Sequence, residues 1–264
     1  MIITEQFIMG KFPDQALCED GLFVSDDFIA VLDGVTSKSN RKFNNMSGGK
    51  AATEVATDIL KSASASISKD ELFRLINDGI KSLYDGDTTG EAAVCMIVFS
   101  KFHKELWVVG DCQCIINRER YNHEKLIDNE LSEIRSRVIK KAIENGATPE
   151  DIAENDIGRQ AIMPALSIQH SYANRTDHPY GYTVLNGTDF TEESIVTYTL
   201  NDGDTVIMAT DGYPKLYDTL EKSEEYLAHI LEYDPLCFQE YKSTKGLQKG
   251  NSSFDDRTYI KFTL

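Results

Sequence analysis

The sequence predicts an α+β fold, because stretches typical of β-strands are separated by stretches with helical spacing. The strand-like stretches are rich in β-branched, aromatic or continuous apolar residues and are bounded by Gly, Asn or Asp. They span residues 28–33, 92–99, 105–109, 112–117, 194–200, 204–210 and 257–262. A two-layered β architecture of about 200–250 residues remains one unit, so we expect residues 1–264 to form a single domain with insertions.

Two helices are expected between the first two strands. Residues 48–63 and 69–84 have helical spacing, and the apolar residues on one side of the second stretch are Leu72, Leu75, Ile76 and Ile80. This spacing predicts a helix pair inserted between two strands of the fold.

A further helix is expected over residues 131–146, where Gly146 provides a plausible cap. A short helix should follow in TPEDIAEN, because Thr148 can cap it and Pro149 takes its first position. Residues 161–192 contain several Pro and Gly residues, and we expect loops and short strands there.

The charge and composition exclude some classes of partner. The formal net charge is −16, whereas phosphate backbones require clustered Lys and Arg, so nucleic acid is not an expected partner. No stretch approaches the ~20 apolar residues of a membrane span. The odd number of cysteines, 5, fits a reducing compartment better than a disulfide scaffold. We therefore expect a cytoplasmic protein that binds neither nucleic acid nor membrane.

Short acidic motifs stand where strand-like residues give way to turns. They are Glu19-Asp20 in CEDGLF, Asp33-Gly34 in FIAVLDGVTSK, Asp211-Gly212 in VIMATDGYPKL and Asp255-Asp256 in NSSFDDRTYIKF. A carboxylate at the end of a strand is fixed in position, and several that converge build an all-oxygen site for hard divalent cations. Such a site is suited to the hydrolysis of phosphate esters.

The order of these motifs resembles the type 2C metal-dependent serine/threonine protein phosphatases, in a divergent, bacterial-type form. The resemblance extends from about residue 14 to residue 262 and also includes MSGGKAA, DTTGEAAVCMIVF and VVGDCQC. It implies an αββα sandwich, in which two antiparallel β-sheets pack face to face and helices flank them. Within the single domain, it places a helical or flap insertion at about residues 118–192.

The resemblance also implies a centre of two Mn²⁺ or Mg²⁺ ions that activate one water. Asp33 would bridge the two ions as a catalytic residue, and the Gly34 carbonyl would bind one of them. Asp211 and Asp255 would hold the other ion. The acidic pair of Glu19 and Asp20 would act on the opposite side, directly or through water, with Asp20 as a second catalytic residue.

Asp111 in VVGDCQC has two interpretations that the sequence leaves open. It resembles the family's ligand for a third, weaker ion, and it is equally an ordinary aspartate in a turn between strands. Many family members have an aspartate four residues after the later Asp-Gly motif, where this chain has Lys215. A centre of two ions is therefore the expectation, with a third as the alternative.

Other departures concern the groups that handle phosphate. Val35 stands where some members have a histidine that acts as a general acid, and residues 13–17 lack the arginine that binds phosphate before the acidic pair. Substrate phosphate would then depend chiefly on the metal ions. His170 and His178 could approach the site as an acid or as a substrate contact, but we expect both to be surface or loop residues. Asp256 replaces the usual asparagine.

Three functions remain open. The leading one is the hydrolysis of phosphoserine or phosphothreonine in a phosphorylated protein substrate, by a monomer. A catalytically silent module that binds a phosphoprotein is the second, because the arginine and histidine are missing. The third is hydrolysis of a small phosphorylated molecule, because substrate selection depends on loops that the sequence does not define.

Overall fold

The computed structural model describes residues 1–37, 41–86 and 90–264. The Asp-Thr-Thr at the start of the DTTGEAAVCMIVF motif, residues 87–89, lies outside the described residues. Two sheets of five strands each form the centre of the molecule, and every pair of neighbouring strands is antiparallel. The predicted pair of antiparallel sheets is confirmed.

The first sheet has the strand order β1-β10-β9-β6-β7. Its strands are β1 (Ile2–Met9), β10 (Arg257–Thr263), β9 (Thr205–Ala209), β6 (Gln113–Ile116) and β7 (Glu119–Tyr121). The second sheet has the order β2-β3-β4-β5-β8. Its strands are β2 (Gly21–Val24), β3 (Phe28–Gly34), β4 (Val94–Ser100), β5 (Glu105–Val109) and β8 (Val196–Thr199).

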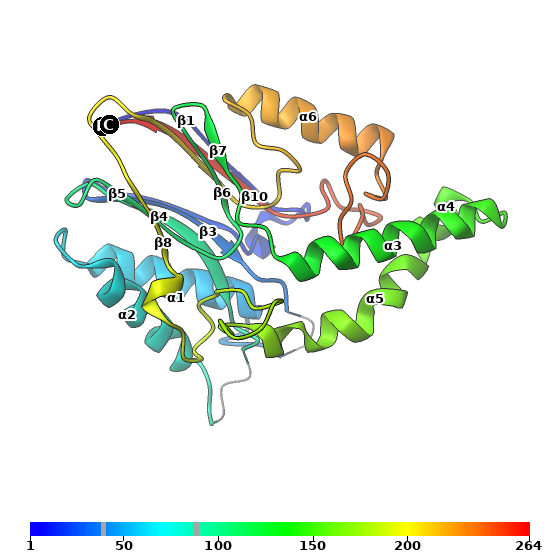
Figure 1. Cartoon of the computed structure of the whole chain (residues 1–264), viewed down its shortest axis with the longest axis horizontal. Coiled ribbons are helices and arrows are strands. Elements are labelled where there is room, and N and C mark those ends of the chain that lie inside the picture. The colour runs from blue at the N-terminus through cyan, green and yellow to red at the C-terminus, as the bar shows by residue number, and fades with distance from the viewer. Residues whose placement is uncertain (38–40, 87–89) are drawn as a thin grey trace.

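Helices cover both outer faces of the sandwich. Figure 1 shows α1 (Gly48–Ser62) and α2 (Lys69–Lys81) below the second sheet, and α6 (Leu220–Tyr233) above the first. The remaining helices, α3 (Leu126–Glu144), α4 (Pro149–Glu154) and α5 (Ile157–Ile168), form an arm that projects from one end of the sandwich. The predicted αββα arrangement is confirmed.

The central strand β4 shows why the sandwich has two cores. All seven of its residues are buried, and successive side chains point to opposite faces. Met96 and Val98 pack towards α1 and α2, whereas Ile97 and Phe99 pack between the sheets. The ring of Phe99 lies 5.0 Å from that of Phe262 in the other sheet. A continuous apolar run is therefore what this strand requires.

The structure of the arm differs from one expectation drawn from the sequence. Residues 161–168 belong to α5, which continues through Pro164, so loops and short strands were the wrong prediction there. Ile162 and Leu166 are buried against Ile127 and Leu131 of α3. This packing stabilises a helix that local propensity alone disfavours.

The predicted strands lie within two residues of the observed ones, but β1, β2 and β7 were not among them. The predicted caps are confirmed. Thr148 and Asp151 form a capping box with Pro149 at the start of α4, and Gly146 follows α3 with a φ of 98°.

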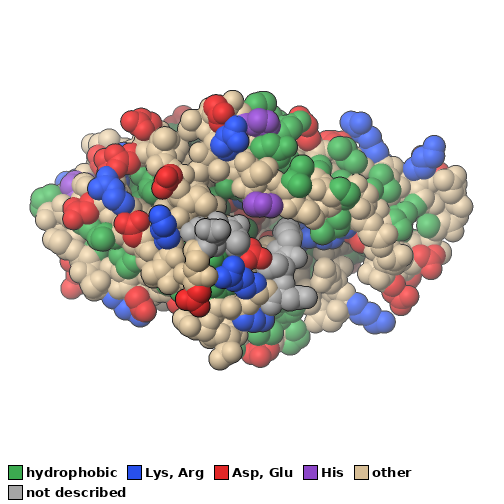
Figure 2. All heavy atoms as spheres, turned by 90° about the horizontal axis from the view of Figure 1, so that it is seen from below, with side chains coloured by type: hydrophobic (Ala, Val, Ile, Leu, Met, Phe, Trp, Pro, Cys, Tyr) green, Lys and Arg blue, Asp and Glu red, His purple; other side chains and the backbone are tan. Residues whose placement is uncertain are grey.

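No helix among the described residues is both long enough and apolar enough to cross a membrane. On the face that Figure 2 shows, acidic and basic side chains are interspersed and do not gather into one patch. Charges of both signs are therefore mixed on this face.

Candidate metal centre

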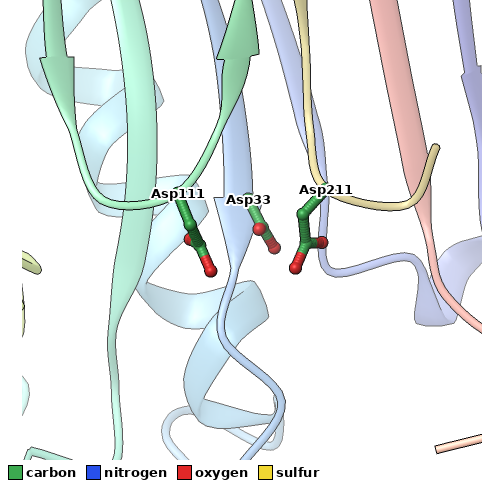
Figure 3. A group of neighbouring side chains, drawn as sticks. All are labelled: Asp33, Asp111 and Asp211. Carbon is green, nitrogen blue, oxygen red and sulfur yellow. The ribbon is translucent and has the colours of Figure 1, made fainter. Parts of the chain in front are cut away.

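Three aspartates from distant parts of the chain meet at one end of the sandwich. Asp33 lies at the end of β3, Asp111 in the turn between β5 and β6, and Asp211 shortly after β9. One carboxylate oxygen of each residue lies within 4.8 Å of the others, and Figure 3 shows the three side chains pointing into the same space. Because β3 and β9 belong to different sheets, this aspartate triad forms where the ends of both sheets converge.

Two glycines let the backbone close around Asp33. A Cβ on Gly34 would lie 2.4 Å from the carbonyl oxygen of Glu19, and a Cβ on Gly49 would lie 2.6 Å from the carbonyl carbon of Gly34. No side chain fits at either position. The end of β3, the first turn of α1 and the acidic pair therefore meet through backbone contact, which is the role of the MSGGKAA motif in this site.

The carboxylates of the aspartate triad repel one another in surroundings that solvate charge poorly. Burial raises the pKa of Asp211 to about 7, and the charges of Asp111 and Asp255 add to the rise. Burial also raises the pKa of Asp33 well above its usual range, with Asp211 as the next cause. A cation between these groups would relieve both effects.

One oxygen of Asp111 supports the same conclusion. Asp111 Oδ1 is buried and accepts no hydrogen bond from the described residues. A buried acceptor without a donor lowers the stability of the folded state. Carboxylate oxygens are the ligands that Mg²⁺ and Mn²⁺ prefer, so the aspartate triad fits a divalent cation.

Asp111 also has a cationic partner that the motifs did not indicate. The ammonium of Lys125 lies 2.7 Å from Asp111 Oδ2. Burial opposes the charge of Asp111, but Lys125 outweighs it and holds the pKa of that carboxyl below its usual value. The ammonium of Lys215 instead lies 5.0 Å from the ring centre of Tyr217.

Glu19 is buried and already accepts hydrogen bonds within the chain. Its Oε1 accepts a hydrogen bond from Ser47 Oγ at 2.6 Å, and its Oε2 accepts one from Thr36 Oγ1 at 2.7 Å. Ser47 also caps α1 through its hydroxyl. Glu19 therefore connects the start of α1 to the loop after β3.

Asp20 occupies a buried position between two threonines. Its Oδ2 accepts hydrogen bonds from Thr210 Oγ1 at 2.7 Å and from Thr258 Oγ1 at 2.9 Å. Burial raises the pKa of Asp20, although the Thr210 bond opposes the rise. Because Thr210 directly precedes Asp211, this contact orients the backbone that carries a member of the aspartate triad.

Asp255 is held by two lysines that sequence reasoning missed. Lys11 Nζ lies 3.1 Å from Asp255 Oδ1, and Lys245 Nζ pairs with Oδ2. Burial opposes ionisation, but the two lysines outweigh it and hold the pKa of Asp255 well below its usual range. The sequence motifs carry no signal for either lysine, because both stand in loops outside them.

Asp256 organises the loop before β2. It accepts hydrogen bonds from the backbone N–H of Lys11 at 2.7 Å and of Glu19 at 3.1 Å. The Lys11 ammonium lies 3.2 Å from Asp256 Oδ2. An aspartate at this position therefore fixes a lysine that is only 5% exposed, near the stretch where the expected arginine is missing.

A cavity of about 810 Å³ lies between the arm and the converging ends of the sheets. The aspartate triad and Asp255 line it, and so do five cationic side chains: Arg120, Lys125, Lys215, Lys242 and Lys245. The exposed His170 is also part of its wall, whereas the ring of His178 stacks on Tyr172 at 4.5 Å. Acidic and cationic side chains thus line one cavity.

No protein-family model and no curated protein matches the sequence. Solved structures, however, resemble the whole chain. The serine/threonine phosphatase MsPP from Mycobacterium smegmatis, in complex with cacodylate, has a TM-score of 0.51 and 12% sequence identity over 100% of both chains. The catalytic domain of the serine/threonine phosphatase PstP, in complex with two manganese ions, has a TM-score of 0.50 and 11% identity over 100% of both chains. The chain therefore has the fold of the PPM-type, or type 2C, serine/threonine phosphatases.

Proposed function

We propose that the chain is a divergent type 2C phosphatase that hydrolyses phosphoserine or phosphothreonine in proteins with Mn²⁺ or Mg²⁺. The observation that carries this proposal is the aspartate triad on the wall of the cavity, with Asp111 Oδ1 buried and without a donor among residues 1–37, 41–86 and 90–264. Two divalent ions, when bound, lower the pKa of a water and neutralise phosphoryl oxygens.

Different residues would hold the two ions. Asp33 lies at the centre of the site and would bridge the ions, with Asp211 and Asp111 on one side. The Gly34 carbonyl would face the second ion, and Glu19 would reach it through water. Asp255 would be a further ligand if an ion displaced Lys11 and Lys245 from its carboxylate.

Asp20 takes a different role from the one that the resemblance implies. Because both of its threonine donors are buried with it, we assign it as a positioning residue for Asp211. Its substitution should weaken metal binding through a shift of the segment 210–211.

The cavity wall supports a phosphorylated substrate. Arg120, Lys215 and Lys242 line the cavity in a chain whose net charge is −16. Cationic side chains attract phosphate, and they provide charge that the missing arginine would otherwise supply. A volume of about 810 Å³ lies within the range of ligand sites.

We further propose that residues 1–264 form one phosphatase domain, with the arm as part of an insertion at about residues 118–192. We expect it to act as a cytoplasmic monomer on phosphorylated proteins and to bind neither nucleic acid nor membrane. All five cysteines are free and buried, as a reducing compartment allows.

One observation favours a second candidate, a silent module that binds a phosphoprotein. Asp255 is held by Lys11 and Lys245, and an ion must displace these cations to use its carboxylate. If they remain in place, the centre holds phosphate without activating water.

Turnover of a phosphothreonine peptide and of p-nitrophenyl phosphate, with Mn²⁺, with Mg²⁺ and with chelator, separates these functions. Metal-dependent turnover that favours the peptide supports the protein phosphatase. Turnover of the small ester alone indicates a small-molecule phosphatase. Peptide binding without turnover of either compound, in protein shown to bind metal, indicates the silent module.

A further inference from the structure

The strongest unassigned feature of the centre is the contact between Lys125 and Asp111. The ammonium lies 2.7 Å from Asp111 Oδ2, and both side chains are only 11% exposed. The same ammonium lies 5.0 Å from the ring centre of Tyr182. A lysine held between a carboxylate and an aromatic face is fixed in position and is not a mobile surface charge.

The two carboxylate oxygens of Asp111 differ in their contacts. Oδ2 pairs with Lys125, while Oδ1 accepts nothing from the described residues. A monodentate carboxylate has one oxygen for an ion and one for an outer partner, and such partners orient metal ligands. Asp111 contributes one oxygen to the aspartate triad, whereas a further ion at Oδ2 would meet the ammonium.

Position 215, where many family members have an aspartate, provides no second carboxylate for a further ion. Lys215 is exposed, and its ammonium lies over the rings of Tyr217 and Tyr226, at 5.0 Å and 5.9 Å. It contributes no oxygen to the centre. A third ion at this place would therefore find Asp111 Oδ2 already paired with a cation and no carboxylate at position 215.

Lys125 also lies where the arm begins. It directly precedes α3, and its carbonyl accepts hydrogen bonds from the N–H groups of Asp128 and Asn129 in the first helical turn. Tyr182 lies on the segment that returns from the arm to the sandwich, and its hydroxyl donates to the carbonyl of Gln169. One side chain therefore connects the metal centre with both ends of the arm.

We propose that Lys125 is a built-in cation of the metal centre. Its ammonium supplies the positive charge at Asp111 that a third ion would otherwise supply, and it limits the centre to two divalent ions. It also holds the start of α3 beside the site. Lys125 is a positioning residue, because it acts through Asp111. This inference rests on the proposed metal-dependent function, but its test does not require turnover.

The test is a calorimetric titration of metal-free protein with Mn²⁺, extended to millimolar concentrations. The natural chain should bind two ions. Lys125→Met should bind one additional, weaker ion, because both oxygens of Asp111 become available and the repelling ammonium is gone. Lys125→Arg should bind two ions, because it keeps the charge. Lys242→Met is the matched control, since Lys242 lines the same cavity but pairs with Glu133, and it should also bind two.

Hydrogen exchange of the segment 122–131 provides the second measurement. In metal-free protein, the amides of the first turn of α3 should exchange faster in Lys125→Met than in the natural chain, and Lys125→Arg should restore the slower rate. If Lys125→Met does not fold, as judged by circular dichroism, Lys125→Gln replaces it in both measurements.

Three results would overturn the proposal. They are a third ion in the natural chain, an unchanged number of ions in Lys125→Met, and unchanged exchange of the segment 122–131. A natural chain that binds no Mn²⁺ would overturn the proposed function as well. A chain that binds two ions but has no phosphatase activity would leave Lys125 in its role and refute only the activity.

Discussion

Arg135 provides the sharpest test of how the arm is joined to the rest of the molecule. Its side chain is fully buried, although it comes from the middle of α3. The guanidinium donates to Asp156 Oδ2 at 2.7 Å and 3.0 Å, and to the carbonyl oxygens of Leu236, Cys237 and Ser243 at 2.8 Å to 3.0 Å. These contacts fix the segment 236–243 against the arm, shortly before Lys245.

We expect Arg135→Met to lower the free energy of unfolding by about 3–5 kcal/mol. Removal of one partner of a buried ion pair costs about that amount, and each stranded carbonyl adds up to about 1–3 kcal/mol unless water reaches it. Asp156 is 22% exposed, so solvent screens part of its lost interaction. The estimate therefore stays in the range for a single broken buried pair.

Urea denaturation followed by circular dichroism measures this loss. With a slope of about 3 kcal/mol per M, the midpoint should fall by about 1–2 M. Arg137→Met, an exposed change in the same helix, should stay within about 0.5 kcal/mol of the natural chain. Adding Asp156→Asn to Arg135→Met should recover part of the loss, because Asn removes the unpaired charge and still caps α5. If Arg135→Met lowered the free energy of unfolding by less than about 1 kcal/mol, Arg135 would not be the residue that joins the arm to the segment 236–243.

Three further outcomes are expected. Mn²⁺ should bind more tightly as the pH rises from 5.5 to 7.5, because Asp211, with its pKa raised to about 7, must lose its proton to bind an ion; calorimetric affinities that do not change over this range would contradict the assignment. Ser47→Ala should cost about 1 kcal/mol in urea denaturation, since α1 loses its cap and Glu19 a donor, and an unchanged midpoint would argue against both contacts. Gly49→Ala should abolish Mn²⁺ binding or prevent folding, because its Cβ would lie 2.6 Å from the backbone of Gly34. Gly79→Ala in α2 meets side-chain atoms and no backbone, so it should leave Mn²⁺ binding intact.

The strand ends of the site were predictable because their signal is local. Asp33, Asp111 and Asp211 each stand where an apolar run gives way to a turn, and the fold then brings them together. The helices α1 and α2 were predictable for a similar reason, since their apolar spacing and caps lie within one segment.

The lysines at the site depend on contacts that no local pattern records. Lys11, Lys125 and Lys245 are ordinary surface residues by type, and only the tertiary structure places them against Asp255 and Asp111. A lone lysine in a loop has no periodicity and no motif. The cationic side of the centre therefore could not be predicted from the sequence.

Two missed elements have specific physical causes. The hairpin of β6 and β7 turns at Asn117 and Arg118, which both have positive φ, whereas Asn-Gly or Asp-Gly is the usual signal for such a turn. The edge strand β1 alternates between exposed and partly buried residues and lacks a continuous apolar run. Pairing with β10 defines it, and that pairing joins the two ends of the chain.

The most direct test of the central claim is the Mn²⁺-dependent hydrolysis of a phosphothreonine peptide by Asp33→Asn. The account predicts a loss of at least about 100-fold in turnover, because the residue proposed to bridge both ions loses a charged oxygen. Asp27→Asn, an exposed change just before β3, should retain the activity of the natural chain. Equal turnover by Asp33→Asn and the natural chain would contradict the claim that the aspartate triad is the phosphatase centre.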